Sequence, residues 1–227
     1  MELIKNDWKF DENIAPIFDD HVSKSVPFYK EIHELINEIS GWFIREETNV
    51  YDIGSSTGTL LRNLKHTYNK KVNYIGIDNS KEMVEISNIS SKDIKIELAD
   101  VTNDFTFYNS SLITAILTMQ FINEEKRQNV IDNIYKGLNK GGAFIIVEKV
   151  LGNNAKFNEI WSDLYHDLKL KNGLSKNHIF DKSRSIRGVM NPISVEGNIK
   201  MLKNAGFNEI DTFFKWNNFI GILAIKN

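Results

Sequence analysis

The segment Asp52-Ile53-Gly54-Ser55-Ser56-Thr57-Gly58 is the part of this sequence whose residue types and spacing are best suited to hold a ligand. Glycine at position 54 lets the backbone approach a ligand closely, and glycine at position 58 lets a following helix pack near the preceding strand. The spacing is acid-x-Gly-x-x-x-Gly, whereas dinucleotide folds use Gly-x-Gly-x-x-Gly to place a pyrophosphate at a helix N-terminus. The Asp52 carboxylate favours a ligand with an ammonium group over a diphosphate. The alternative is an ordinary glycine turn of an α/β protein.

Two further acids follow short apolar runs in the same way. Asp78 comes 26 residues after Asp52 and could accept both hydroxyls of a ribose, although it could instead cap a helix together with Asn79-Ser80. Asp100, beside Val101, lies where the amino group of an adenine would be met. Acids at the ends of three successive parallel strands share one edge of the sheet, which is where ligands bind in such folds. Together the three acids predict a site for a ligand that carries an ammonium group, a ribose and an adenine.

Short apolar runs alternate with amphipathic stretches from residue 48 onward, which predicts parallel strands joined by crossover helices on both faces of a sheet. The predicted fold class is α/β, with a Rossmann-like, mostly parallel seven-stranded sheet that ends in an antiparallel hairpin. The predicted strands are 49–53, 72–77, 94–98, 111–117, 143–147, 207–213 and 219–225. The predicted helices are 59–68, 80–87, 124–138, 154–171 and 194–205.

The first part of the chain is expected to be helical. Apolar residues recur at three- and four-residue steps between residues 11 and 45, with Pro27 in the first turn of the expected helix and Ser25 as its cap. We expect a single domain over residues 1–227. Its expected parts are a helical lid over 1–45, a ligand-binding core over 46–150, and a helical insertion with closing strands over 151–227.

The composition excludes several classes of site and partner. A net charge of −2 gives no reason to expect tight binding of nucleic acid. The absence of cysteine excludes disulfides, thiolate metal sites and cysteine nucleophiles. No metal site is expected, because His21, His33, His66 and His178 show no metal-ligand spacing. The absence of cysteine also fits a reducing cytosol, and we expect a cytoplasmic protein. No membrane partner is expected, because no apolar run approaches the length of a membrane span. The expected partner is a small-molecule substrate.

With this turn and these acids, the sequence resembles the class I S-adenosylmethionine-dependent methyltransferases. Within them it is most similar to the carboxy-S-adenosyl-L-methionine synthases, which use prephenate to make a carboxylated cofactor for wobble-uridine modification in tRNA. The resemblance covers nearly the whole chain, with its strongest stretches at residues 8–12, 24–29, 50–56, 77–80, 120–121, 134–139, 148–149, 166–167, 171–173, 194–196 and 205–207.

The resemblance implies a class I methyltransferase fold, S-adenosyl-L-methionine or its carboxylated form as cofactor, and a homodimer. It also implies that the N-terminal helix closes over the cofactor as a lid. By similarity, cofactor contacts are expected at Tyr29, Gly54, Ser55, Ser56, Asp78, Asn79, Asp100 and Val101.

Two positions depart from the pattern of the carboxylated-cofactor enzymes. Ile116 stands where that family has an asparagine that touches the ligand, and Ser183 stands where it has the arginine that binds the extra carboxylate. Serine cannot replace the charge of an arginine fork. Arg184 could take over through a one-residue slip of the loop expected at 181–185, and Arg187 is a second possibility. Without such a shift, we expect S-adenosylmethionine to be preferred over its carboxylated form.

Three functions remain open from the sequence. The favoured one is an enzyme that transfers the methyl group of S-adenosylmethionine in line to a small or medium-sized acceptor, with proximity supplying most of the rate. The alternatives are the prephenate-dependent carboxy-S-adenosylmethionine synthase and a non-catalytic cofactor-binding protein. His166 is the candidate base, although a histidine hydrogen-bonded at a helix interface is the commoner role for such a residue.

Overall fold

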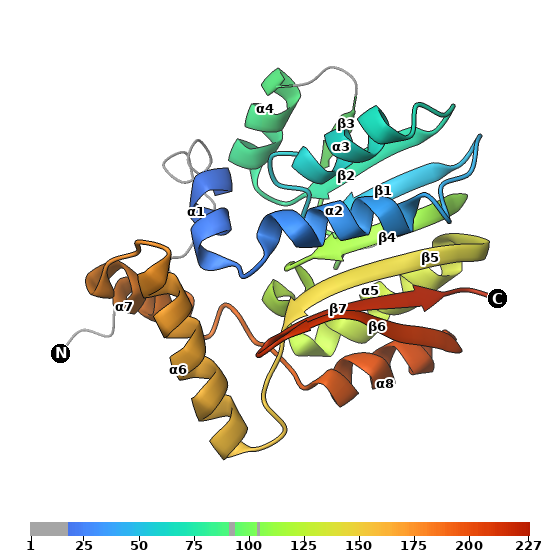
Figure 1. The fold of residues 1–227 in the computed structure, drawn as a ribbon. Helices are drawn as coiled ribbons and strands as arrows, with labels where there is room; N and C mark the ends of the chain where they lie inside the picture. The colour runs from blue at the N-terminus through green and yellow to red at the C-terminus, as the bar shows by residue number, and fades with distance from the viewer. Residues whose placement is uncertain (1–17, 91–93, 104) are drawn as a thin grey trace.

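The centre of the fold is a seven-stranded sheet in the order β3-β2-β1-β4-β5-β7-β6 (Figure 1). The computed structural model describes residues 18–90, 94–103 and 105–227. β1 to β5 pair in parallel, and β7 runs antiparallel to both β5 and β6. The predicted sheet with its antiparallel terminal hairpin is therefore confirmed. The strands are β1 Asn49–Ile53, β2 Asn73–Asp78, β3 Lys95–Leu98, β4 Ser110–Ile116, β5 Leu138–Lys149, β6 Glu209–Trp216 and β7 Phe219–Ile225.

Helices cover both faces of the sheet, because its central strands are apolar on both sides. On β5, Phe144 and Ile146 pack with α5 and α8, whereas Ile145 and Val147 pack on the opposite face with α2 and α3. Successive side chains of a strand point to opposite faces, so each strand contributes to two cores. The helices are α1 Phe18–Ser25, α2 Tyr29–Ser40, α3 Thr59–Thr67, α4 Lys81–Ser90, the short 3₁₀ helix η2 Met119–Phe121, α5 Glu124–Gly137, α6 Ala155–Lys171, α7 Lys176–Ser185 and α8 Val195–Ala205.

Capping side chains fix where the last three helices begin. Asn154, Ser175 and Ser194 each accept a hydrogen bond from the backbone N–H three residues further on, at 3.1, 3.2 and 3.0 Å. Gly206 ends α8 with a φ of 116°, a conformation that favours glycine. The predicted helices 154–171 and 194–205 are thus confirmed to within one residue at each end.

The expected single N-terminal helix is two helices in the described part of the chain. α1 ends at Ser25, so Ser25 does not cap the start of a helix, and α2 begins at Tyr29 after Phe28 with a φ of 54°. Pro27 lies in this break, where its missing N–H and its restriction of the preceding residue interrupt the helix. Residues 1–17 of the expected lid lie outside the described residues.

The segment 181–185 is helical rather than the expected loop. It forms the second half of α7, which begins at its Ser175 cap. A one-residue slip that would carry Arg184 inward would therefore break helical hydrogen bonds.

Three helices, α1, α6 and α7, gather beyond the carboxyl ends of the parallel strands. α1 packs against α2 and α6, and α6 packs against α7. Figure 1 shows this group on the left, away from α5 and α8. Within the ranges that the structure describes, no helix has both the length and the apolar character needed to cross a bilayer.

Candidate functional site

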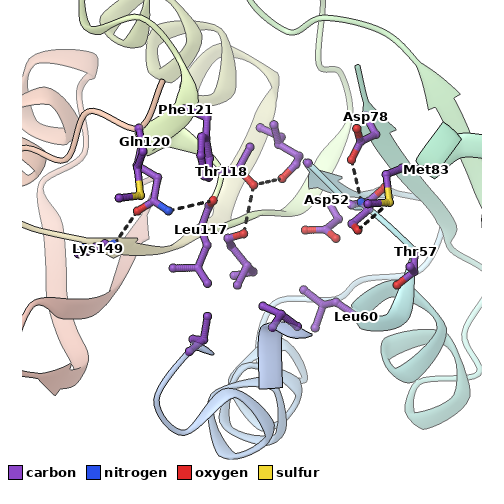
Figure 2. A pocket seen from close by; sticks show the side chains of 18 of the residues that line it. Asp52, Thr57, Leu60, Asp78, Met83, Leu117, Thr118, Gln120, Phe121 and Lys149 are labelled. Atoms are coloured by element: carbon purple, nitrogen blue, oxygen red, sulfur yellow. Dashed lines mark hydrogen bonds between the residues drawn. The ribbon is translucent and has the colours of Figure 1, made fainter. Parts of the chain in front are cut away.

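A pocket opens at the carboxyl ends of β1, β2 and β4, and α1, α2, α6 and α7 contribute to its walls. Figure 2 shows a close view of a pocket whose lining includes Asp52 and Asp78 on one side and Lys149 on the other. This edge of an open α/β sheet is where such folds bind ligands. The position agrees with the edge predicted from the three acids.

The turn after β1 brings backbone into the pocket. Gly54 has a φ of 69°, and its N–H donates to the carbonyl oxygen of Ile77 at 2.7 Å, which ties the turn to β2. A Cβ atom added at Gly54 would collide with the Thr118 side chain. Both observations explain why glycine is needed here, since a side chain would be strained and would displace the turn from the pocket.

Asp78 joins the two loops that border the ligand edge. Its Oδ2 accepts from the N–H of Ser56 at 2.8 Å, and its Oδ1 accepts from the N–H of Ser80 at 2.9 Å. The cap of α4 is Ser80 itself, whose Oγ accepts from the N–H of Met83 at 3.2 Å. Burial raises the pKa of Asp78, and the backbone hydrogen bonds oppose that effect. Each carboxylate oxygen can accept more than one hydrogen bond, so capacity remains for a ligand.

Asp52 is the most deeply buried acid of the pocket. It is 4% exposed, and its Oδ1 accepts from Thr114 Oγ1 at 2.6 Å. Burial, with a smaller contribution from the charge of Asp78, raises the pKa of Asp52 to about 7. A cationic group in the pocket would favour the ionised carboxylate. This environment suits the ammonium group of a ligand.

The third acid lies on the loop after β3. Asp100 Oδ1 accepts from the N–H of Thr102 at 2.8 Å, and its Oδ2 accepts from Asn103 Nδ2 at 3.1 Å. Asp100 and the buried Val101 both line the pocket. These hydrogen bonds shape the loop, and contact with an adenine stays a prediction.

The residues present fit a nucleoside that carries an amino-acid chain, such as S-adenosylmethionine. Ser55 Oγ is buried and has no hydrogen-bond partner within the described part of the chain, and Ser55 lines the pocket. The buried Asp52 carboxylate, the unpaired Ser55 hydroxyl and the close approach at Gly54 together provide an acceptor, a polar contact and room for a ligand. The remaining predicted contacts, Tyr29, Ser56 and Asn79, line the same pocket.

Three predicted site residues do not line the pocket. Gly58 precedes α3 with a φ of 77°, and a side chain there would meet Ser87 and Ile94, which matches the predicted need for close helix packing. His166 is exposed on α6, and partial burial followed by the charges of nearby lysines lowers its pKa. The Arg184 guanidinium lies 5.4 Å from the centre of the Phe180 ring on α7. The predicted roles of His166 and Arg184 stay predictions.

A group of cations that the sequence did not predict lies in the same pocket. Lys149 from the end of β5, Lys169 from α6 and Lys182 from α7 all line it. The ammonium groups of Lys149 and Lys169 lie 4.9 and 4.1 Å from the centre of the Tyr165 ring. The four-residue step between Tyr165 and Lys169 places both on one face of a helix, but lysines at such spacing usually belong to solvated surfaces.

A buried polar frame holds the pocket wall at η2. Arg127 is 2% exposed and donates to the carbonyl oxygens of Ile122, Gln120 and Asn191, at 2.8, 3.2 and 2.6 Å. Glu148 Oε1 accepts from the Met119 N–H at 2.9 Å. Burial raises the pKa of Glu148 to about 8, against the lowering effects of backbone hydrogen bonds and Arg127. The frame fixes the backbone beside Lys149.

Comparison with known proteins agrees with the site geometry. The sequence profile of a family described as a methyltransferase domain matches residues 50–142, which contain Asp52, Asp78 and Asp100. The chain is 54% identical over 222 residues to the carboxy-S-adenosyl-L-methionine synthase of Staphylococcus epidermidis, covering 96% of this chain and 97% of that protein. It is 36% identical over 228 residues to the protein of the same name from Methylococcus capsulatus, covering 97% and 94%.

Solved methyltransferase structures share the fold. An O-methyltransferase family protein from Burkholderia thailandensis matches with a TM-score of 0.65 and 12% identity, over 96% of this chain and 60% of that one. Human N-acetylserotonin methyltransferase, solved in complex with S-adenosylmethionine, matches with a TM-score of 0.57 and 14% identity, over 97% and 60%. At these identities the likeness concerns the fold alone.

Proposed function

The chain belongs to the family of carboxy-S-adenosyl-L-methionine synthases, and we propose that it replaces one hydrogen of the S-adenosylmethionine methyl group with a carboxyl group. The observation that carries this proposal is the 54% identity across 96% of the chain, which extends beyond the methyltransferase core. The sequence alone favours methyl transfer to a small or medium-sized acceptor. The relatives support its carboxylation alternative better.

The carboxyl donor implied by the resemblance is prephenate, and the conversion balances with it. The methyl carbon loses a proton and bonds to the carboxyl carbon. Prephenate loses that carboxyl group and its ring hydroxyl, so its ring becomes aromatic in phenylpyruvate. The hydroxide and the proton leave as water. S-adenosylmethionine supplies a methyl group whose C–H bonds are acidified by the adjacent sulfonium.

The residues of this chain would bind and orient both molecules. Asp52 suits the amino group, Asp78 suits the ribose hydroxyls, and Asp100 with Val101 suits the adenine. Tyr29 and its neighbour His33, whose rings lie 4.3 Å apart, line the pocket from α2 and would help to exclude water in the role of a lid. These assignments extend the predicted site to the proposed reaction.

The two departures from the family pattern do not remove every cation from the site. Ser183 is exposed, and its Oγ donates to the Phe180 carbonyl oxygen at 2.9 Å. Lys182, the residue before it, lines the pocket. A lysine amine from α7 therefore lines the pocket even without an arginine at 183.

The direct experiment is incubation of the purified protein with S-adenosylmethionine and prephenate, followed by mass spectrometry of the nucleoside. We expect carboxy-S-adenosylmethionine, and phenylpyruvate in equal amount. S-adenosylhomocysteine formed only when a methyl acceptor is added would instead support ordinary methyl transfer. A bound nucleoside that is never converted would support the non-catalytic alternative.

We also propose a homodimer, with α6 as part of its interface. Phe157, Ile160 and Leu164 are 45, 38 and 43% exposed, and their three- and four-residue steps place them on one face of the helix. Exposed apolar side chains at this spacing favour contact with a partner. Light scattering of Leu164→Glu should show a monomer where the natural chain shows a dimer, and a monomeric natural chain would refute the proposal.

A further inference from the structure

The pocket has two electrostatically different ends. Asp52 and Asp78 lie on one side, and Figure 2 shows Lys149 on the other, beyond Leu117 and Thr118. Lys169 and Lys182 line the pocket as well. These three lysines come from β5, α6 and α7, which follow one another along the chain. The fold has therefore brought like charges together in one cavity.

Two of these cations, Lys149 and Lys169, have no anionic partner among the residues that the structure describes. Over residues 18–90, 94–103 and 105–227, neither Lys149 Nζ nor Lys169 Nζ makes a hydrogen bond or an ion pair, and both make a cation–π contact with the Tyr165 ring. Lys169 is only 9% exposed. A cation–π contact offsets only part of the cost of removing an ammonium group from water. An anion in the pocket would supply the missing partner.

Burial and neighbouring lysine charges lower the pKa values of Lys169 and Lys182, which favours an anion at this end of the pocket. Burial and then the charge of Lys149 lower the pKa of Lys169 to about 8, and burial and then Lys169 lower that of Lys182 to about 7. Burial also lowers the pKa of Lys149. An anion placed among them would reverse the repulsion and keep all three protonated. This end of the pocket therefore favours an anionic group of a ligand over a cationic one.

We propose that Lys149 and Lys169, together with Lys182, form the carboxylate-binding end of the pocket, where they hold the carboxylate of the donor before transfer and that of the product afterwards. The identity of this carboxylate rests on the proposed function. The Tyr165 ring is a positioning group that fixes the two ammonium groups in place. Both nucleosides carry the sulfonium cation and only the carboxylated form adds a carboxylate, so the same lysines would favour the carboxylated form over S-adenosylmethionine.

The test is calorimetric binding of S-adenosylmethionine and carboxy-S-adenosylmethionine to Lys169→Met and Lys149→Met. Lys171→Met is the matched control, because Lys171 is exposed two residues further along α6. Loss of a charge-assisted hydrogen bond should raise the Kd of the carboxylated form at least tenfold. The Kd of S-adenosylmethionine should stay unchanged or fall. Thermal melting should show that the methionine variants remain folded, since each replaces a partly buried charge by an apolar chain of similar length.

An equal loss of affinity for both nucleosides, or no loss for the carboxylated one, would overturn the proposal. Lys169→Arg should restore much of the selectivity if charge is the cause, and failure to do so would count against it. The synthase assay is read separately. Product formation by the natural chain with no selective loss in the variants refutes only the lysine site, whereas selective loss without product formation refutes only the synthase.

Discussion

Replacing Asp52 by asparagine should stabilise the ligand-free protein while weakening S-adenosylmethionine binding. Burial raises the pKa of the Asp52 carboxyl from 3.8 to about 7 in the folded protein. Because the folded pKa is raised, the unfolded chain releases this proton first, and stability is lost as pH rises from about 4 to 7. At about 1.4 kcal/mol for each unit of pKa, ionisation of Asp52 lowers the free energy of unfolding by about 4 kcal/mol above pH 7.

Asp52→Asn removes this cost and keeps a side-chain oxygen that can accept from Thr114. Urea unfolding should show the variant to be more stable than the natural chain at pH 8, with the difference disappearing near pH 4. The same variant should bind S-adenosylmethionine about 10- to 100-fold more weakly at pH 8, because a charge-assisted contact with the amino group is lost. Asp211→Asn, at an exposed position, is the control. Unchanged affinity would show that Asp52 does not contact the amino group of the ligand. A less stable variant at pH 8 would show that the buried carboxylate does not destabilise the ligand-free protein.

Further substitutions test other parts of the site. Asp78→Ala should weaken S-adenosylmethionine binding at least tenfold by calorimetry, through loss of about 1.5–3 kcal/mol of hydrogen bonding to ribose; equal affinity would leave Asp78 with only its role in joining two loops. Gly54→Ala should lower the melting temperature and abolish binding, because its φ of 69° and the contact with Thr118 both oppose a side chain. Arg127→Met should lower the free energy of unfolding by about 3–5 kcal/mol, since buried carbonyls and Glu148 lose a cation; a change below about 1 kcal/mol in urea unfolding would contradict the frame at η2.

The sheet and its ligand edge could be predicted because their signals are local. Apolar runs define the strands, and Asp52, Asp78 and Asp100 follow them directly, so the sheet order alone brings these acids to one edge. Their exact hydrogen bonds could not be predicted. Asp78, for example, contacts the loop of Ser56 as well as its own, which requires knowing how two turns approach each other.

The cationic end of the pocket escaped prediction because it depends on tertiary packing. Lys149, Lys169 and Lys182 resemble surface lysines in sequence, and only the packing of α6 and α7 over the pocket buries them. α7 itself was missed because its sequence is too polar to show a strong apolar face, although the Ser175 cap was readable. The break at Pro27 was misjudged because a first-turn proline and a proline between two helices give the same local pattern.

The central claim is that this chain carboxylates S-adenosylmethionine, and the most direct measurement is mass spectrometry of the nucleoside after incubation with S-adenosylmethionine and prephenate. We predict conversion to carboxy-S-adenosylmethionine with one phenylpyruvate for each product molecule. Recovery of unchanged S-adenosylmethionine from folded, cofactor-binding protein, with no phenylpyruvate beyond that formed without protein, would contradict it.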